Sequence, residues 1–368
     1  MKKIFFIIIT LFTLNLSSFS SHIVGGEISW ICDGPNRSQY RFFMTVFRDC
    51  GGIGFGFFNE TIDIVGGTLP RNAANQPFST IVMKPDMARW INERNGDTSP
   101  RCNTQFGSEL SCANGDPGTI QAFYYQSDPI TIQGVPPNRG WTFYWQSPCC
   151  RPGNYVNGTP AGSASPMLLR AMMFPTRGRE NTDPCLDDSP EFRSLPVSAI
   201  CRGQQFTYNS TAIDKNLDSL VYSWDNPLNP PQNDPENYEY APGFSPTNPT
   251  PDKTFDVNNI PSTLNPISGI NELAIFSGFG TEKYLLVYRV DSWRDGKVIA
   301  SIFRELPVSV FNCPRLPNNN VNTIPQVRIN GVPSNDTFVT ITAGQEVRIP
   351  IQVTDPDPQM VTAFPEGL

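Results

Sequence analysis

The sequence predicts a mostly β fold made of tandem β-sandwich domains, and three observations support this class. Apolar residues alternate with polar ones at a period of two in many segments, as half-buried strands require. Turn formers are abundant, with 36 prolines and 28 glycines, whereas charged residues make up only 17% of the chain. A length of 368 residues is enough for two or three domains.

The N-terminus has the pattern of a secretory signal peptide. Lys2 and Lys3 precede an apolar run from Ile4 to Leu16, and Ser18 and Ser20 supply small residues for cleavage. We therefore expect residues 1–20 to be removed and the mature chain to begin at Ser21. No later stretch approaches the roughly 20 apolar residues of a transmembrane helix, so we expect a secreted protein at the extracellular cell surface.

The composition excludes several classes of function. A net charge of -7 disfavours nucleic acid, whose phosphates would be repelled. The only histidine is His22, beside the expected mature terminus, so histidine-based catalysis is not expected and we predict a protein that is not an enzyme. The nine cysteines indicate disulfides formed in an oxidising compartment.

Individual segments support the β prediction in chain order. In "WTFYWQ", Trp141, Phe143 and Trp145 fall on one face, which predicts a core strand with Tyr144 as the exposed ring. "QYRFFMTVF" and "FVTITAGQEVRIPIQV" alternate in the same way. Residues 84–95 are the one segment that looks helical, and Asp-Gly within "WRDGK" predicts a hairpin near Arg294.

Two aperiodic stretches, 178–190 and 313–325, predict domain boundaries. Between them, residues 226–251 carry eight prolines, which predicts a long surface loop and the main partner contact. An internal repeat supports this partition, because "GQ" at Gly203 and at Gly344 is followed by alternating residues and then by an aspartate 11 positions later, Asp214 or Asp355. Such a unit is typical of tandem sandwiches.

Several motifs resemble a known family. "SHIVGGEISWIC", "RFFMTVFRDCGG", "LSCANGDPGTIQAFYY" and "WTFYWQSPCCR" occur in this order, followed by "AIDKNLDSLVYSW" and "WRDGKVIASIFRELPVSVFNC". Together they resemble the N-terminal region of large Bacteroidetes surface proteins that are exported by the type IX secretion system and associated with gliding motility. The resemblance covers nearly the whole mature chain.

The resemblance implies a structural or adhesive cell-surface protein. Its partners would be other cell-surface or secretion-system proteins, or surface glycans. The implied domains are a mostly β N-terminal domain over residues 21–180, a cadherin- or immunoglobulin-like sandwich over residues 186–316, and an incomplete copy of that sandwich over residues 322–368.

The acidic loops also resemble the A-x-D-x-D calcium loops of cadherin-like domains, although Asn216 stands where that pattern has a second aspartate. Calcium needs six to eight oxygen ligands, more than one loop supplies. In a cadherin-like order the preceding linker would supply the rest, at the junction of the first two domains. The expected ligands are Asp183, Asp187, Asp188, Asp214, Asn216 and Asp218. Asp355 and Asp357 would repeat the arrangement with Asn318, Asn319 and Asn320.

Two disulfides are expected. The cadherin-like order places Cys201 beside Cys313, at the end where the last strand finishes. Cys102 and Cys112 flank a polar segment that has no core of its own, which favours a local bond between them.

Other interpretations of these residues remain open. Asp214 and Asp218 could form only a polar turn, or a carboxylate pair of a secreted glycosidase if they lie in a deep groove. A carbohydrate-binding module is the main alternative function, and it requires Tyr144, Tyr238 and Tyr240 to be exposed together.

Overall fold

The computed structural model describes most of the chain from residue 22 to residue 312 and short segments beyond it. The described residues are 22–33, 39–52, 54–99, 111–116, 118–159, 165–176, 185, 187–193, 196, 199–312, 326–329, 332–333, 346 and 348–355. The expected signal peptide lies outside them, as do Cys102, Asp183, Cys313, Asn318, Asn319, Asn320 and Asp357.

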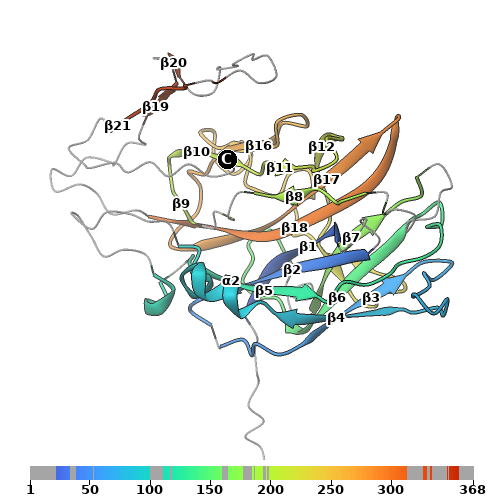
Figure 1. The fold of residues 1–368 in the computed structure, drawn as a ribbon. Helices are drawn as coiled ribbons and strands as arrows, with labels where there is room; N and C mark the ends of the chain where they lie inside the picture. Colours follow the sequence, from blue (N-terminus) through green and yellow to red (C-terminus); the bar gives the residue numbers. More distant parts are fainter. Residues whose placement is uncertain are drawn as a thin grey trace, which may run out of the picture.

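Thirteen strands of the described residues form one sheet, which dominates the fold (Figure 1). In sheet order these are β12 (Ser219–Trp224), β17 (Glu282–Arg294), β18 (Lys297–Phe311), β1 (Ile23–Asp33), β2 (Gln39–Asp49), β5 (Ile120–Ser127), β4 (Thr80–Pro85), β3 (Glu60–Val65), β6 (Trp141–Cys150), β7 (Pro166–Met173), β13 (Leu228–Asn229) and β14 (Glu236–Asn237), with β9 (Ala199–Cys201) paired to β18.

Smaller sheets and three short helical segments complete the described structure. The small sheets are β10 (Gln205–Asn209) with β16 (Ile270–Ala274) and β15 (Ile260–Leu264), β11 (Ala212–Ile213) with β8 (Glu191–Phe192), and β20 (Val332–Pro333) with β19 (Gln326–Ile329) and β21 (Ile351–Thr354). The helical segments are α2 (Met87–Asn92), η2 (Arg94–Gly96) and η4 (Cys112–Asn114). In the described residues, no helix has the length and apolar character needed to cross a membrane.

The long strand β18 closes the main sheet on itself. One edge of β18 pairs with β17 along its length. The other edge of β18 pairs with three strands in turn: its residues 300–302 pair with β7, residues 304–305 with β1 and residues 309–311 with β9. The pairing therefore runs from β18 through β1, β2, β5, β4, β3, β6 and β7 and returns to β18.

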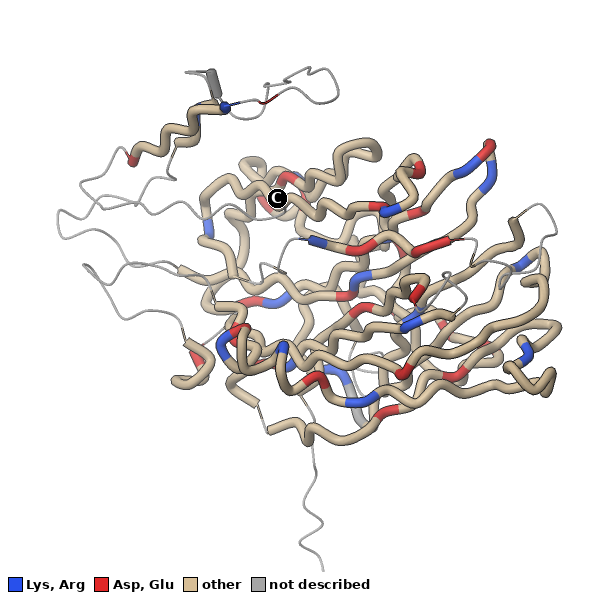
Figure 2. The backbone as a smooth tube through the Cα atoms, in the orientation of Figure 1, with Lys and Arg blue, Asp and Glu red and all other residues tan. Residues whose placement is uncertain are grey.

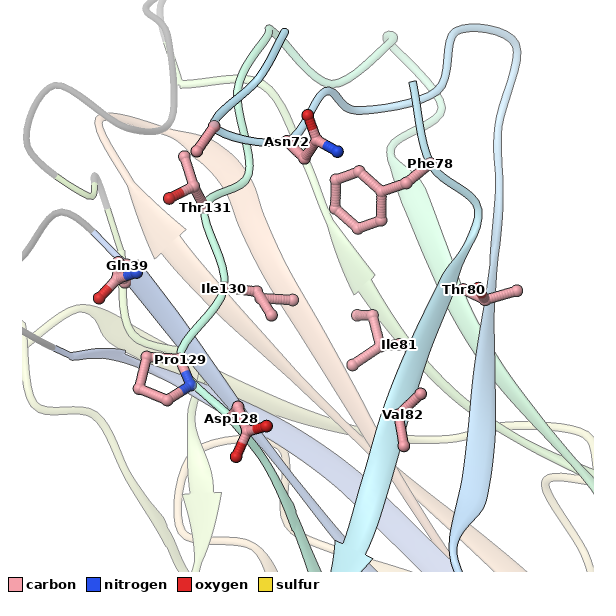
Figure 3. Close-up of a pocket in the computed structure, with 11 residues that line it drawn as sticks. Gln39, Asn72, Phe78, Thr80, Ile81, Val82, Asp128, Pro129, Ile130 and Thr131 are labelled. Atoms are coloured by element: carbon pink, nitrogen blue, oxygen red, sulfur yellow. The ribbon is translucent and has the colours of Figure 1, made fainter. Parts of the chain in front are cut away.

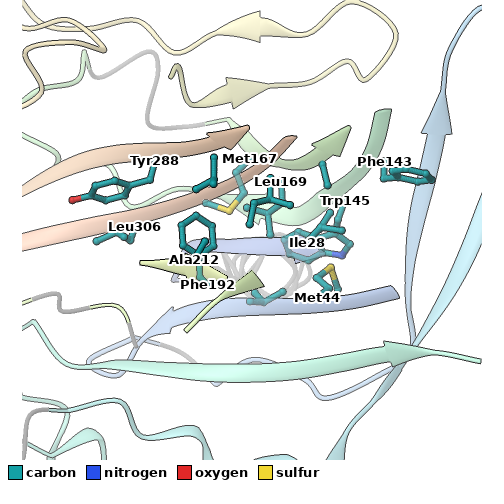
Figure 4. Packing of buried hydrophobic residues seen from close by; sticks show 14 of the residues in the cluster. Ile28, Met44, Phe143, Trp145, Met167, Leu169, Phe192, Ala212, Tyr288 and Leu306 are labelled. Carbon is teal, nitrogen blue, oxygen red and sulfur yellow. The ribbon is translucent and has the colours of Figure 1, made fainter. Parts of the chain in front are cut away.

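Buried aromatic and aliphatic side chains fill the space between these strands. Trp30, Phe42 and Phe143 pack together with ring centroids 4.7 to 6.0 Å apart, and each is fully buried. Figure 4 shows other members of the same core, including Ile28 of β1 and Tyr288 of β17. The alternation predicted for β6 is confirmed, because Trp141, Phe143 and Trp145 all join this core.

The mostly β class is confirmed, but separate tandem sandwiches are not. Strands from residues 21–180 and from residues 186–316 belong to one sheet and share one core cluster. The aperiodic stretch 178–190 therefore does not separate two sheets, because β18 pairs with β1 and β7, and β13 pairs with β7. The division of the chain into domains stays a prediction.

The local predictions for the hairpin and the helix are largely confirmed. Arg294 pairs with Lys297 across a two-residue turn, and Asp295 and Gly296 both have positive φ, 53° and 74°, as a type I′ hairpin requires. The helical segment is shorter than expected. Asp86 caps α2 by accepting a hydrogen bond from the Arg89 N–H at 3.0 Å.

The proline-rich run 226–251 is partly packed against the sheet. It contributes β13 and β14, and Leu228, Asn229 and Tyr238 are buried. Leu228 covers the outer face of β6 and β7, where it packs with Leu168 and Tyr144. The prediction that Tyr144 is exposed is therefore wrong, since its ring is only 8% exposed.

The repeat has a common local structure in both copies. Strand β11 ends directly before Asp214, and strand β21 ends directly before Asp355. Each aspartate therefore begins the loop that follows a strand. The expected partners of Asp355 lie outside the described residues.

The disulfide predicted between Cys102 and Cys112 is wrong, because Cys112 is bonded to Cys50 with a Cα–Cα distance of 5.0 Å. The short helical turn η4 places Cys112 beside the end of β2, a contact between residues 62 positions apart in the chain. Cys201 is disulfide-bonded. Its neighbour in register is Phe311, two residues before Cys313, so the Cys201–Cys313 bond stays a prediction.

Candidate functional site

Five of the six residues predicted to bind calcium meet in one buried cluster. Asp187 and Asp188 come from the segment before β8, whereas Asp214, Asn216 and Asp218 come from the loop between β11 and β12. Ser292 and Arg294 of β17 complete the cluster. We call these seven residues the acidic clasp. The sixth predicted ligand, Asp183, lies outside the described residues.

The segment 187–190 is fixed by the free edge of β1. Strand β1 pairs with β18 only at residues 26–27, so its later residues need other partners. Ser189 exchanges hydrogen bonds with the backbone of Trp30 at 2.8 and 3.0 Å. The Cys32 N–H donates to Asp188 Oδ1 at 2.6 Å. Both acidic residues of this segment are thereby held against the main sheet.

The loop 214–218 is shaped by its own first carboxylate. Asp214 Oδ1 accepts the N–H of Asn216 at 2.8 Å and the N–H of Asp218 at 3.2 Å, which is an Asx-type turn. Asn216 Oδ1 then accepts the N–H of Asp188 at 2.7 Å. The loop and the segment before β8 are thus joined directly.

Strand β17 supplies the polar groups that face the carboxylates. Ser292 Oγ donates to Asp214 Oδ2 at 3.1 Å. Arg294 donates from Nε to Asp218 Oδ1 at 2.8 Å and from Nη2 to Asp187 Oδ1 at 2.7 Å. A single guanidinium therefore bridges two acidic segments. The hairpin that carries it has basic and acidic residues together at its tip (Figure 2, upper right).

The clasp has more negative charge than Arg294 neutralises. Burial, and secondly the nearby carboxylates of Asp214, Asp218 and Asp188, raise the pKa of Asp187 to about 9, against the opposing effect of Arg294. Burial also raises the pKa of Asp214. Within the described residues, Asp187 Oδ2 is buried without a hydrogen-bond partner, and Asp187 as a whole is only 5% exposed.

The clasp suits calcium in its chemistry but not in its present arrangement. Its side chains carry carboxylate, amide and hydroxyl oxygens, and calcium binds oxygen ligands. The unpartnered Asp187 Oδ2 is an available ligand. In the described part of the chain, however, no group of three or more His, Cys, Asp or Glu side chains is arranged to hold a metal ion. Arg294 lies between the carboxylates of Asp187 and Asp218 instead.

Sequence reasoning found the acidic residues and missed Ser292 and Arg294. Ser292 and Arg294 are two positions apart on a strand, so their side chains lie on one face. The sequence alone could have predicted that these two polar side chains share a face. Only the register between β12 and β17, with Ser219 opposite Trp293, brings that face to the loop.

The alternative sites predicted from sequence are not assembled. Tyr144 and Tyr238 are buried, and the Tyr240 hydroxyl is buried as well, so these rings form no exposed sugar-stacking platform. Asp214 and Asp218 do not line the pocket beside β4.

That pocket, of about 440 Å³, lies elsewhere, between β4 and residues 128–131 (Figure 3). Ile81 and Ile130 face each other across it (Figure 3). The one acidic residue of its described lining, Asp128, pairs with Lys84 at 2.5 Å. The pocket thus provides no carboxylate pair of the glycosidase type.

Comparisons of this chain with protein-family models, with curated proteins and with solved structures give no match. The function therefore has to be argued from the clasp and the fold.

Proposed function

We propose that this chain is an exported, non-enzymatic structural or adhesive protein of the cell surface, of the gliding-motility and type IX secretion type, in which calcium bound at the acidic clasp holds distant segments together. The observation that carries the proposal is the buried Asp187 Oδ2 atom, which has no partner in the described residues and belongs to a carboxyl group with three other carboxylates nearby. A buried carboxylate oxygen without a partner is costly, and a bound cation removes that cost.

The position of the clasp suits a load-bearing role. It joins β1, the segment before β8, the loop before β12 and the end of β17, which span residues 30 to 294 of the chain. A cation held there adds a cross-link between these parts of the chain to the hydrogen bonds and strand pairings that already join them. The Cys50–Cys112 disulfide adds a covalent link and indicates an oxidising compartment.

The cellular part of the proposal rests on the signal-peptide pattern and the family resemblance. It is tested by N-terminal sequencing of the protein from its native cells and by protease treatment of intact cells. We expect a mature terminus at Ser21 and digestion from outside. An uncleaved terminus, or full protection in intact cells and digestion only after lysis, would contradict export to the surface.

The calcium part is tested by isothermal titration of the chelator-treated mature chain. We expect binding of calcium by the wild-type protein and loss of that binding in Asp187→Asn, which keeps the size of the side chain and removes its charge. Asp256→Asn serves as the matched control, because Asp256 shapes an exposed turn outside the clasp. Equal calcium binding by all three proteins would place the ion elsewhere.

A further inference from the structure

We infer that Arg294 is a built-in cation that competes with calcium for the acidic clasp, so that calcium enters only as the guanidinium leaves. This inference rests on the proposed calcium binding and names the residue that regulates it. Among the described residues, the guanidinium donates to Asp187 once and to Asp218 twice, at 2.5 to 2.8 Å.

The two cations need the same oxygens. Calcium coordinates oxygens at about 2.3 to 2.6 Å and requires six to eight of them. Asp218 has both carboxylate oxygens committed to Arg294, and Asp187 has one of its two. A calcium ion between these side chains would lie against the guanidinium, where two positive charges repel at short range. In the described residues, no three or more His, Cys, Asp or Glu side chains are arranged to hold a metal ion, so the carboxylates must also move together as calcium replaces the guanidinium.

Arg294 is placed where it can leave. It forms the last pair of the β17–β18 hairpin, opposite Lys297, and its side chain is 26% exposed. The turn beyond it is made by the backbone of Asp295 and Gly296. A change of rotamer can therefore carry the guanidinium to solvent while the hairpin stays paired.

The departure leaves a set of carboxylate ligands from two segments, the one before β8 and the loop between β11 and β12. Asp187 then offers both carboxylate oxygens, one of them already without a partner in the described residues. Asp218 offers two more, and Asp214 Oδ2 lies beside them at the Ser292 hydroxyl. The guanidinium thus holds the clasp closed without calcium and sets the concentration at which calcium replaces it.

The test is calcium titration by calorimetry of the chelator-treated mature chain in three forms: wild type, Arg294→Gln and Arg289→Gln. Arg289 is the matched control, because it also lies on β17 and also pairs with acidic residues, Asp225 and Asp291, outside the clasp. Removing the competitor should lower the Kd for calcium at least about tenfold, the scale of one charge-assisted hydrogen bond. Arg289→Gln should leave the Kd unchanged.

Thermal unfolding gives a second readout. In chelator, Arg294→Gln should melt below wild type, because its carboxylates face no guanidinium. With calcium it should gain more in Tm than wild type gains. If Arg294→Gln folds only in calcium, calcium has replaced the guanidinium and the inference is supported. If it does not fold in either condition, Arg294→Lys decides, since it loses the planar fork and should bind calcium more tightly than wild type.

The outcomes separate this inference from the proposal beneath it. Calcium binding by Arg294→Gln with none measurable in wild type supports both, because the guanidinium then outcompetes the ion. The inference is overturned if the wild type binds calcium as tightly as Arg294→Gln or more tightly. The same comparison with Arg294→Lys applies where Arg294→Gln does not fold. In either case the proposed calcium site itself remains supported. Absence of binding in every form overturns the calcium proposal and this inference with it.

Discussion

Asp187 and Arg294 are joined by a 2.7 Å hydrogen bond although 107 positions separate them in the chain. Asp187 lies at the start of the segment fixed to β1, and Arg294 ends β17. Their contact closes a cluster of four carboxyl groups, two of which pair with the Arg294 guanidinium. The stability of this region should therefore depend on pH, on the turn before β12 and on added cations.

The first prediction concerns pH in the absence of calcium. The pKa of Asp187 rises from 3.8 to about 9 in the folded protein, so the folded state binds this proton more tightly than the unfolded state does. The contribution of Asp187 to the unfolding free energy is therefore complete below its pKa in the unfolded state. It is lost as pH rises through its pKa in the folded state. Urea unfolding in chelator between about pH 5 and pH 9 should show this decline.

Asp187→Asn is the control for that prediction, because an amide resembles the protonated acid and does not titrate. Its stability should vary less with pH than that of the wild type over the same range. The groups that face Asp187 are Arg294, Asp214, Asp218 and Asp188, and the raised pKa of Asp214 adds a slope of the same sign. Equal slopes for wild type and variant would assign the pH dependence to other residues.

The second prediction concerns Asp214→Ala. The substitution removes the acceptor of two backbone N–H groups and of the Ser292 hydroxyl. Loss of hydrogen bonds to a buried charged group should cost about 2 kcal/mol or more of unfolding free energy. Asp256→Ala breaks a comparable turn that is exposed and should cost less than about 1 kcal/mol. Similar losses in both variants, measured by urea unfolding, would show that the clasp adds nothing.

The third prediction concerns the Cys50–Cys112 disulfide. Replacing both cysteines by alanine should lower the unfolding free energy by about 2 to 5 kcal/mol, since the bond closes a long loop. Non-reducing peptide mapping should recover Cys50 linked to Cys112, and should also show whether Cys201 is linked to Cys313. Recovery of Cys102 linked to Cys112 would refute the structural assignment.

The fourth prediction concerns the buried ion pair of Arg151 and Glu305. Their side chains are 0% and 4% exposed, and Arg151 also donates to Asn229 Oδ1 and to the Leu228 carbonyl. Glu305→Gln leaves a buried guanidinium without its counter-ion, which should cost about 3 to 5 kcal/mol. It should also expose the run 226–251 to proteases.

The matched control for this pair is Glu93→Gln, which breaks the exposed pair with Arg89 and should cost less than about 1 kcal/mol. A loss below 1 kcal/mol for Glu305→Gln, or unchanged proteolysis of the run, would mean that the ion pair does not hold that run to the sheet.

Local patterns in the sequence predicted local structure well. The alternation of Trp141, Phe143 and Trp145 and the Asp-Gly turn at residue 295 depend on neighbours a few positions away, and both are confirmed. The sharing of one sheet by β1 and β18 depends on a contact between Gly26 and Glu305. No periodicity encodes such a contact, so the predicted sandwiches were drawn as separate.

The clasp illustrates the same limit. The acidic spacing identified Asp187, Asp188, Asp214 and Asp218, because carboxylates near a turn are visible in sequence. The position of Arg294 follows from pairing between β12 and β17, and its role as counter-ion could not be predicted without that register. Likewise, Tyr144 packs against Leu228 of the proline-rich run, a contact between distant residues that its own strand pattern does not encode.

The central claim is that calcium stabilises the acidic clasp, and thermal unfolding of the mature wild-type chain tests it most directly. Matched samples in chelator and in millimolar calcium should differ in Tm by several degrees, because a ligand that binds only the folded state raises its stability. Asp187→Asn should lose most of that difference. Equal Tm values in chelator and calcium for the wild type, with no calcium binding in calorimetry by either the wild type or Arg294→Gln, would contradict the claim and leave a clasp closed by Arg294 alone.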